Sequence, residues 1–180
     1  MRRVALVACL LASGCGLLKR TPNTFYALDT VAGAAARATI AGTPIGIDGV
    51  ELPPGLDRRE VTTRAEGNKL DVRGHHQWAS PLEDMITHTL SFNLASRLPE
   101  GMVVLPGQAK PGAMRSLYVT FEDLAPGPDN VFVLDARWTM GELVRHERIT
   151  VPLQSAESAA VVAAMSQALG QLADRIAATL

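Results

Sequence analysis

The first 15 residues constrain this chain more than any other segment. Two arginines follow Met1, an apolar stretch covers Val4–Leu11, and small residues lead to Cys15. A basic start, a short apolar run and a small-residue cleavage point are typical of a secretory signal peptide. So short an apolar helix does not cross a hydrocarbon core of about 30 Å. We therefore predict that residues 1–14 are a signal peptide and that the remaining chain folds after export.

The residues at the predicted cleavage point resemble a bacterial lipobox, in which small residues precede an acylated cysteine. The motif here is Ala12-Ser13-Gly14-Cys15, with Leu11 before it. Cys9 would leave with the signal peptide, so Cys15 would be the one cysteine of the mature chain. Acylation explains this cysteine, because a lipidated sulfur neither reacts nor pairs. We predict a covalent lipid on Cys15; an ordinary cleaved signal with an incidental cysteine is the alternative.

The residue after the cysteine bears on which membrane holds the anchor. In enteric-type sorting an aspartate there favours the inner membrane, whereas this chain has Gly16. We therefore predict anchoring at the periplasmic face of the outer membrane. Residues 15–23 would form a short lipidated tether. Residues 24–180 would form one domain, because a chain of 180 residues suits one domain and buries a sizeable core.

Composition and charge exclude several classes of protein. Hydrophobic residues make up 47% of the chain and charged residues 19%, as in a globular protein. Loss of Arg2 and Arg3 leaves 15 of the 17 basic residues against 18 acidic ones, so the mature chain is mildly acidic. It therefore has no electrostatic reason to bind nucleic acid. Aromatic residues, at 4%, offer few platforms for stacking bases.

Alternating apolar and polar residues predict a series of short strands, separated by turn residues. Two of them flank Glu66-Gly67-Asn68 and are expected to form a hairpin, and the last three an antiparallel meander. Val31–Ala41 is either a weak helix or a loop. The predicted strands are Phe25–Leu28, Pro44–Val50, Val61–Arg64, Lys69–Val72, Val103–Leu105, Ser116–Leu124, Val131–Met140 and Glu142–Val151.

Two helices complete the prediction. Ser80–Glu83 combines an N-cap serine, a proline at the first helical position and a glutamate at the third, which makes a capping box. Ser155 is expected to cap the second helix. The fold class is α+β: a mostly antiparallel sheet with two main helices packed on one face, in a single domain. The core-facing residues are Leu82, Ile86, Leu90 and Leu94 in the first helix and Val161, Met165, Leu169, Leu172 and Ile176 in the second.

The usual catalytic and metal motifs are missing from the sequence. It has no Gly-rich phosphate loop, no Gly-x-Ser-x-Gly nucleophile and, in the mature chain, no Cys-x-x-Cys. His75-His76 is interpreted as a pair of solvated turn residues, and Asp57–Glu60 as a salt-bridged loop. We therefore predict no enzyme, no metal and no cofactor besides the lipid on Cys15. A hydrolase would need one of these histidines beside Asp57 and a serine.

The order and spacing of several short motifs resemble a known family. The motifs are Phe25-Tyr26-Ala27-Leu28, Ile45-Gly46-Ile47, Leu52-Pro53, Leu56-Asp57-Arg58, Val61-Thr62-Thr63-Arg64, Leu70, Trp78-Ala79-Ser80-Pro81-Leu82, Asn93-Leu94-Ala95 and Leu98-Pro99. In this arrangement the mature chain resembles the ABC-type transport auxiliary lipoproteins, also called the PqiC family. Three positions depart from the family pattern: Gly55, Gln77 and Ser80 stand where an aromatic, a basic and an acidic residue are common.

The resemblance implies a non-catalytic accessory of an MCE-type lipid transport system, placed where the transport tunnel docks at the outer membrane. It implies an MCE-domain protein as partner, and rings in the family make a homo-oligomer an expectation. The alternative is a standalone periplasmic lipoprotein that carries lipid in an apolar cavity between its helices and sheet. The motif residues expected to bind a partner or to hold the fold are Leu56, Asp57, Arg58, Trp78, Pro81 and Asn93. For Trp78 we leave core packing and partner contact open, and for Asn93 we expect hydrogen bonds to neighbouring backbone.

Overall fold

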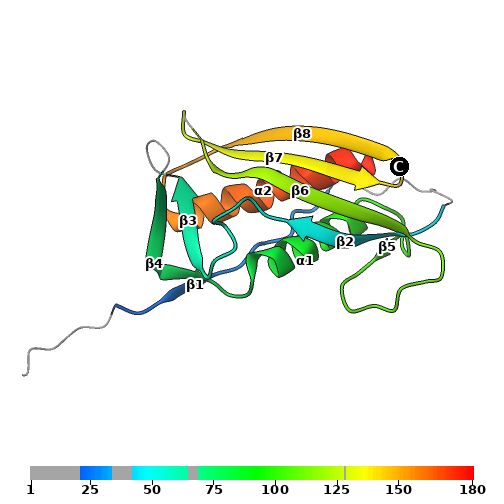
Figure 1. Ribbon diagram of the computed structural model, residues 1–180, viewed down its shortest axis with the longest axis horizontal. Coiled ribbons are helices and arrows are strands. Elements are labelled where there is room, and N and C mark those ends of the chain that lie inside the picture. Colours follow the sequence, from blue (N-terminus) through cyan, green and yellow to red (C-terminus); the bar gives the residue numbers. More distant parts are fainter. Residues whose placement is uncertain (1–20, 34–41, 65–68, 128) are drawn as a thin grey trace, which may run out of the picture.

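A computed structural model describes residues 21–33, 42–64, 69–127 and 129–180 (Figure 1). The predicted signal peptide, Cys15 and most of the tether lie outside these residues. Most of the undecided segment Val31–Ala41 lies outside them too, and its first three residues have no regular secondary structure.

The larger sheet has five strands, and the antiparallel meander predicted for its last three is confirmed. The β2 strand, second from one edge of the sheet, however runs parallel to both of its neighbours. The sheet is therefore mixed rather than purely antiparallel, because a long connection through a helix returns the chain in the same direction. The strand order is β5 (Val103–Val104), β2 (Ile45–Glu51), β6 (Arg115–Pro126), β7 (Val131–Met140) and β8 (Leu143–Pro152).

The smaller sheet holds β1 (Thr24–Tyr26), β4 (Leu70–Trp78) and β3 (Glu60–Arg64), in that order. The hairpin of β3 and β4 is confirmed, and β1 pairs with β4 in parallel. Because β1 supports its second half, β4 continues to Trp78 instead of ending near Val72. The interpretation of His75 and His76 as turn residues is therefore wrong, since both lie within this strand.

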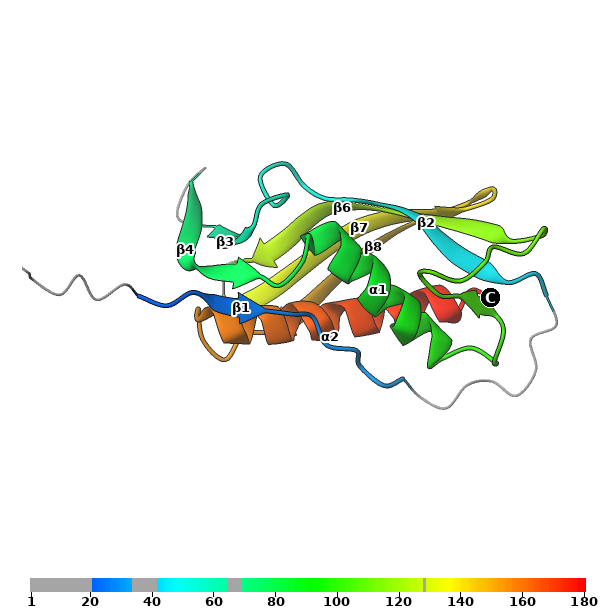
Figure 2. The ribbon, with the colours of Figure 1, turned by 90° about the horizontal axis from the view of Figure 1, so that it is seen from below.

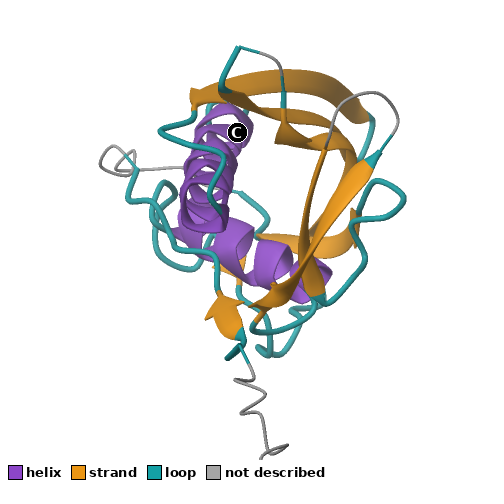
Figure 3. Ribbon diagram, turned by 90° about the vertical axis from the view of Figure 1, so that its left-hand side faces the viewer, coloured by secondary structure: helices purple, strands orange, loops and turns teal. Residues whose placement is uncertain are grey.

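Helices α1 (Leu82–Ala95) and α2 (Ser158–Ala177) pack on one face of the larger sheet (Figure 2). Viewed from the side in Figure 3, the strands curve over the top and right, and the helices close the left and lower sides. Every predicted core-facing residue of both helices is at most 3% exposed. They join residues of the β-strands in one hydrophobic cluster. No helix within the described ranges is long and apolar enough to cross a bilayer.

Both predicted helix caps are wrong. Pro81 is the N-cap of α1, because its ψ of 133° is extended and its carbonyl accepts the first helical hydrogen bond, from Met85. Ser80 thus lies one residue too early for its hydroxyl to cap the helix. Helix α2 begins after Glu157, also without a side-chain cap, and the Ser155 hydroxyl accepts a hydrogen bond from the Glu157 N–H outside the helix.

Candidate functional site: a groove at the N-terminal end

Four of the six motif residues line one surface groove of about 580 Å³. They come from the loop after β2 and from the junction between β4 and α1. Figures 1 and 2 show that β1 lies at the same end of the molecule. The groove residues are Asn23, Phe25, Asp57, Arg58, Arg59, Gln77, Trp78, Ala79, Ser80 and Pro81.

Main-chain hydrogen bonds hold the three segments of the groove together. The Trp78 N–H donates to the Arg59 carbonyl over 2.8 Å, which ties the loop to β4. The Ala79 N–H donates to the Tyr26 carbonyl over 2.8 Å, which ties β1 to the same point. The groove is therefore built on paired backbone rather than on a free loop.

Leu56 and Trp78 form the floor of this end of the molecule. Leu56 is 8% exposed and Trp78 5%, and both belong to the hydrophobic cluster together with Leu82, the first residue of α1. A tight turn presents Leu56: its N–H donates to the Pro53 carbonyl, and Gly55 has a φ of +89° that a side chain would strain. Both residues therefore belong to the hydrophobic core, and Trp78 also lines the groove.

The rim of the groove carries charge and one exposed aromatic ring. Arg58 lies 3.8 Å from Glu60, and both side chains are partly exposed, so this long contact contributes little. The Arg59 side chain has no partner among the residues that the structure describes. Asp57 is exposed, and Phe25 is 63% exposed. Within the predicted salt-bridged loop Asp57–Glu60, the structure thus shows one long ion pair, between Arg58 and Glu60.

Asn93 lies away from the groove and is fully buried in α1. Its side-chain oxygen accepts the Val31 N–H over 2.7 Å, and Arg97 donates to the Val31 carbonyl over 2.8 Å. Arg97 also forms an ion pair of 2.6 Å with Asp174 of α2. On α2, Gly170 leaves room for Val31, because a Cβ there would lie 2.8 Å from the Val31 Cβ. The predicted backbone hydrogen bond of Asn93 is confirmed, and its role is to fasten the segment after β1 to both helices.

His76 meets a serine, but this pair does not make a hydrolase. Its Nδ1 lies 2.6 Å from the Ser158 hydroxyl, to which Arg73 also donates over 3.1 Å. Ser158 is fully buried, so a substrate does not reach its oxygen. Asp57 lines the groove instead, and His75 faces Asn23 at 3.4 Å. The contacts of His76 fasten the smaller sheet to the start of α2.

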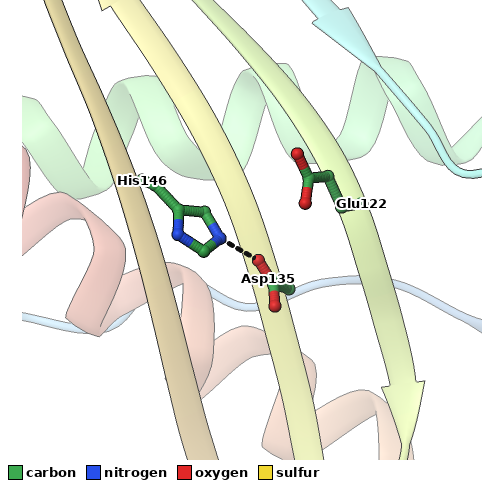
Figure 4. A group of neighbouring side chains, drawn as sticks. All are labelled: Glu122, Asp135 and His146. Atoms are coloured by element: carbon green, nitrogen blue, oxygen red, sulfur yellow. Dashed lines mark hydrogen bonds and ion pairs between the residues drawn. The ribbon is translucent and has the colours of Figure 1, made fainter.

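The larger sheet carries a charged cluster that sequence reasoning missed. Glu122, Asp135 and His146 lie side by side on β6, β7 and β8, on the face away from the helices (Figure 4). Their ligand atoms are within 4.8 Å of one another. Arg148 already binds Asp135 over 2.6 Å, however, and Arg137 binds Glu122. The three residues are thus held in an ion-pair network, in which a cation would have to displace both guanidinium groups.

The buried member of this network is Asp135, which is 7% exposed. Burial raises the pKa of its carboxyl group, but the hydrogen bonds from His146 and Arg148 outweigh burial and hold the pKa below its usual range. The alternating pattern of the strands places these residues on the outer face. The proximity of the three side chains depends on a β-bulge in β6 between Phe121 and Asp123. The local sequence does not predict this bulge.

The fold and the ordered motifs define a class of protein. Residues 26–177 match the family of ABC-type transport auxiliary lipoprotein components, and the chain belongs to that family. It is 27% identical over 143 residues to the intermembrane transport lipoprotein PqiC of Escherichia coli (strain K12), covering 77% of this chain and 75% of that protein. The PqiC of Shigella flexneri matches to the same extent.

Solved structures share the fold. The crystal structure of an uncharacterized protein aligns with a TM-score of 0.74 and 21% identity, over 88% of this chain and 99% of that one. Protein XCC0632 from Xanthomonas campestris aligns with a TM-score of 0.58 and 17% identity, over 86% and 92% of the two chains. The family resemblance read from the motifs is confirmed.

Proposed function

We propose that this lipoprotein is an outer-membrane-anchored accessory of an MCE-type intermembrane lipid transport system. The observation that carries the proposal is the family match over residues 26–177, together with relatives that are named intermembrane transport lipoproteins. The basic and apolar leader, Cys15 and Gly16 support a lipid anchor in the outer membrane. The role is docking or assembly rather than catalysis, and a buried Ser158 beside His76 agrees with that.

A short tether would keep the body close to the membrane. Nine residues, from Cys15 to Asn23, separate the proposed lipid from β1. Even fully extended, they reach only about 30 Å. With such an anchor, the end of the molecule that carries β1 and the groove would stay near the bilayer, and the rest of the body would extend toward the periplasm, where an MCE-domain protein would arrive.

The motif residues divide between two tasks. Leu56, Trp78 and Asn93 hold the fold, as their burial and hydrogen bonds require. Asp57, Arg58 and Pro81 lie on the groove and are exposed. We propose that these three contact something outside the chain, and this part of the interpretation remains a prediction.

The test is a pull-down of the lipidated protein from crosslinked envelopes, with mass spectrometry of the partners. An MCE-domain protein recovered together with outer-membrane material is the expected result. The Cys15→Ala variant, exported but not acylated, serves as the control and should lose the outer-membrane material. Recovery of lipid without any MCE-domain protein would overturn the docking role.

The alternative of a standalone lipid carrier requires an apolar cavity between helices and sheet. Residues of both helices and of β2, β6, β7 and β8 instead pack there in one hydrophobic cluster. The groove lies at the surface, and so does a smaller cavity of about 340 Å³ beside α1, lined by Leu28, Met85 and His88 among others. Lipid extracted in equimolar amount from the purified, unacylated body would revive the carrier role.

We extend the proposal to a homo-oligomer, because a ring of copies would surround a transport tunnel. Mass photometry of the detergent-solubilised lipoprotein tests this directly. Several subunits per particle are expected, and a monomer at micromolar concentration would contradict the ring without affecting the docking role.

A further inference from the structure

We infer that the groove beside β1 binds the headgroup of a zwitterionic phospholipid in the membrane that holds the anchor. The inference rests on the proposed lipid anchor and adds the chemistry of the ligand. Three observations on the described residues carry it: the charges on the rim, the exposed aromatic ring and the position of the groove beside β1, the first described strand.

The charges on the rim match both ends of such a headgroup. Arg58 and Arg59 offer two guanidinium groups, whose planar forks bind phosphate oxygens in pairs. Arg59 has no described partner, and Arg58 has only the loose contact to Glu60. Asp57, the neighbouring residue, supplies the carboxylate that a headgroup ammonium requires. A purely anionic ligand would be repelled by the carboxylate, and a purely cationic ligand would be repelled by the guanidinium groups.

The exposed ring of Phe25 lies where a bilayer interface would cover it. Phe25 is 63% exposed, the highest value among the large hydrophobic residues of the described chain. It stands on β1, next to Gln77 of β4 and on the rim of the groove. Apolar side chains such as Phe enter the boundary between headgroups and acyl chains, and such a ring beside arginines is typical of contact with a membrane surface.

The tether brings the groove to the headgroups. Its reach of about 30 Å keeps the local concentration of lipid high. A groove of about 580 Å³ that is open to solvent accommodates a headgroup while the acyl chains remain in the bilayer.

Trp78 provides the measurement. The chain has two tryptophans, Trp78 on the groove and Trp138, which is fully buried in the core. The full lipidated protein carrying Trp138→Phe would be placed in vesicles of phosphatidylethanolamine and phosphatidylglycerol that contain headgroup spin-labelled phospholipid. We expect quenching of Trp78 emission, and at least a twofold loss of that quenching when Arg58→Gln and Arg59→Gln are added.

The control variant removes the same charge elsewhere. Lys110→Gln with Arg145→Gln changes two exposed cations away from β1 and the groove, and should leave the quenching unchanged. Equal quenching in both double variants, or none in the parent, would overturn the inference. Reversal by millimolar inorganic phosphate would assign a general anion site and would also overturn it.

Failure of this inference can be distinguished from failure of the proposed function. If the Arg58 and Arg59 variants keep the quenching but lose crosslinks to an MCE-domain protein, the groove holds a protein segment and the lipid inference fails alone. If no MCE-domain protein is recovered but quenching depends on the arginines, the docking role fails and the headgroup site stands.

Discussion

The groove and the outer face of the larger sheet both carry charged side chains, but those on the sheet are paired with one another and those on the groove are mostly not. On the sheet, Asp135 is held by His146 and Arg148, and Glu122 by Arg137. On the groove, Arg59 has no described partner and Phe25 is left uncovered. Paired charges on a surface satisfy one another and need nothing from outside. An unpaired guanidinium beside an exposed ring has no described partner within the chain, which is why we propose the groove, rather than the paired cluster on the sheet, as the surface that meets a ligand.

The largest effect is expected below the groove, at Trp78. Trp78→Ala should lower the free energy of unfolding by about 3–5 kcal/mol, because it empties a large buried volume. Trp138→Ala, beneath the larger sheet, is the matched comparison and should cost a similar amount. Urea titration followed by circular dichroism measures both. A loss below about 1 kcal/mol for Trp78 alone would mean that its ring serves an external contact rather than the core.

The next effect tests the paired surface at Asp135. Asp135→Asn should cost about 1–2 kcal/mol at neutral pH, because charge-assisted hydrogen bonds from His146 and Arg148 are lost. Asp129→Asn, in the exposed turn between β6 and β7, changes the same charge and should shift stability by less than about 0.5 kcal/mol. Equal effects of the two substitutions would show that the network does not stabilise the sheet.

The same pair of variants predicts a pH dependence. The folded-state pKa of Asp135 lies below its usual range, so its contribution is complete above the unfolded pKa of about 3.9. That contribution is lost as the pH falls from about 4 through the lower folded pKa. The wild type should therefore lose more stability on acidification than Asp135→Asn. Asp48 also has a pKa lowered by hydrogen bonds from Lys110 and Ser116. Its contribution to the acid sensitivity is the same in the wild type and in Asp135→Asn, so it cancels in the comparison.

Local patterns in the sequence predicted the parts of the fold that depend on neighbours along the chain. The apolar stripes of α1 and α2 and the alternation in β6 are read directly from spacing. The parallel pairing of β2 and the length of β4 were missed, because each depends on a strand that lies far away in the sequence. The predicted helix caps lie one or two residues before the observed ones, because the backbone angles at Pro81 and Glu157 decide where the helices begin.

The candidate site shows the same division. The family motifs singled out Asp57, Arg58, Trp78 and Pro81 separately, and the structure brings them together through the hydrogen bond between Trp78 and Arg59. Phe25 belonged to a predicted strand, but its exposure follows from the edge position of β1, which spacing alone does not give. The network around Asp135 depends on register across three strands, and so it was found only in the structure.

The smallest effect on stability is expected on the rim of the groove. Arg58→Gln with Arg59→Gln should change the free energy of unfolding by no more than about 0.5 kcal/mol, because both side chains are solvated and form one loose ion pair at most. The same urea titration measures it. A loss above about 1 kcal/mol would show that the arginines hold the loop in place, and any loss of lipid quenching would then reflect a distorted groove. An unchanged unfolding curve together with lost quenching assigns the two guanidinium groups to the ligand, because the floor formed by Leu56 and Trp78 is then intact.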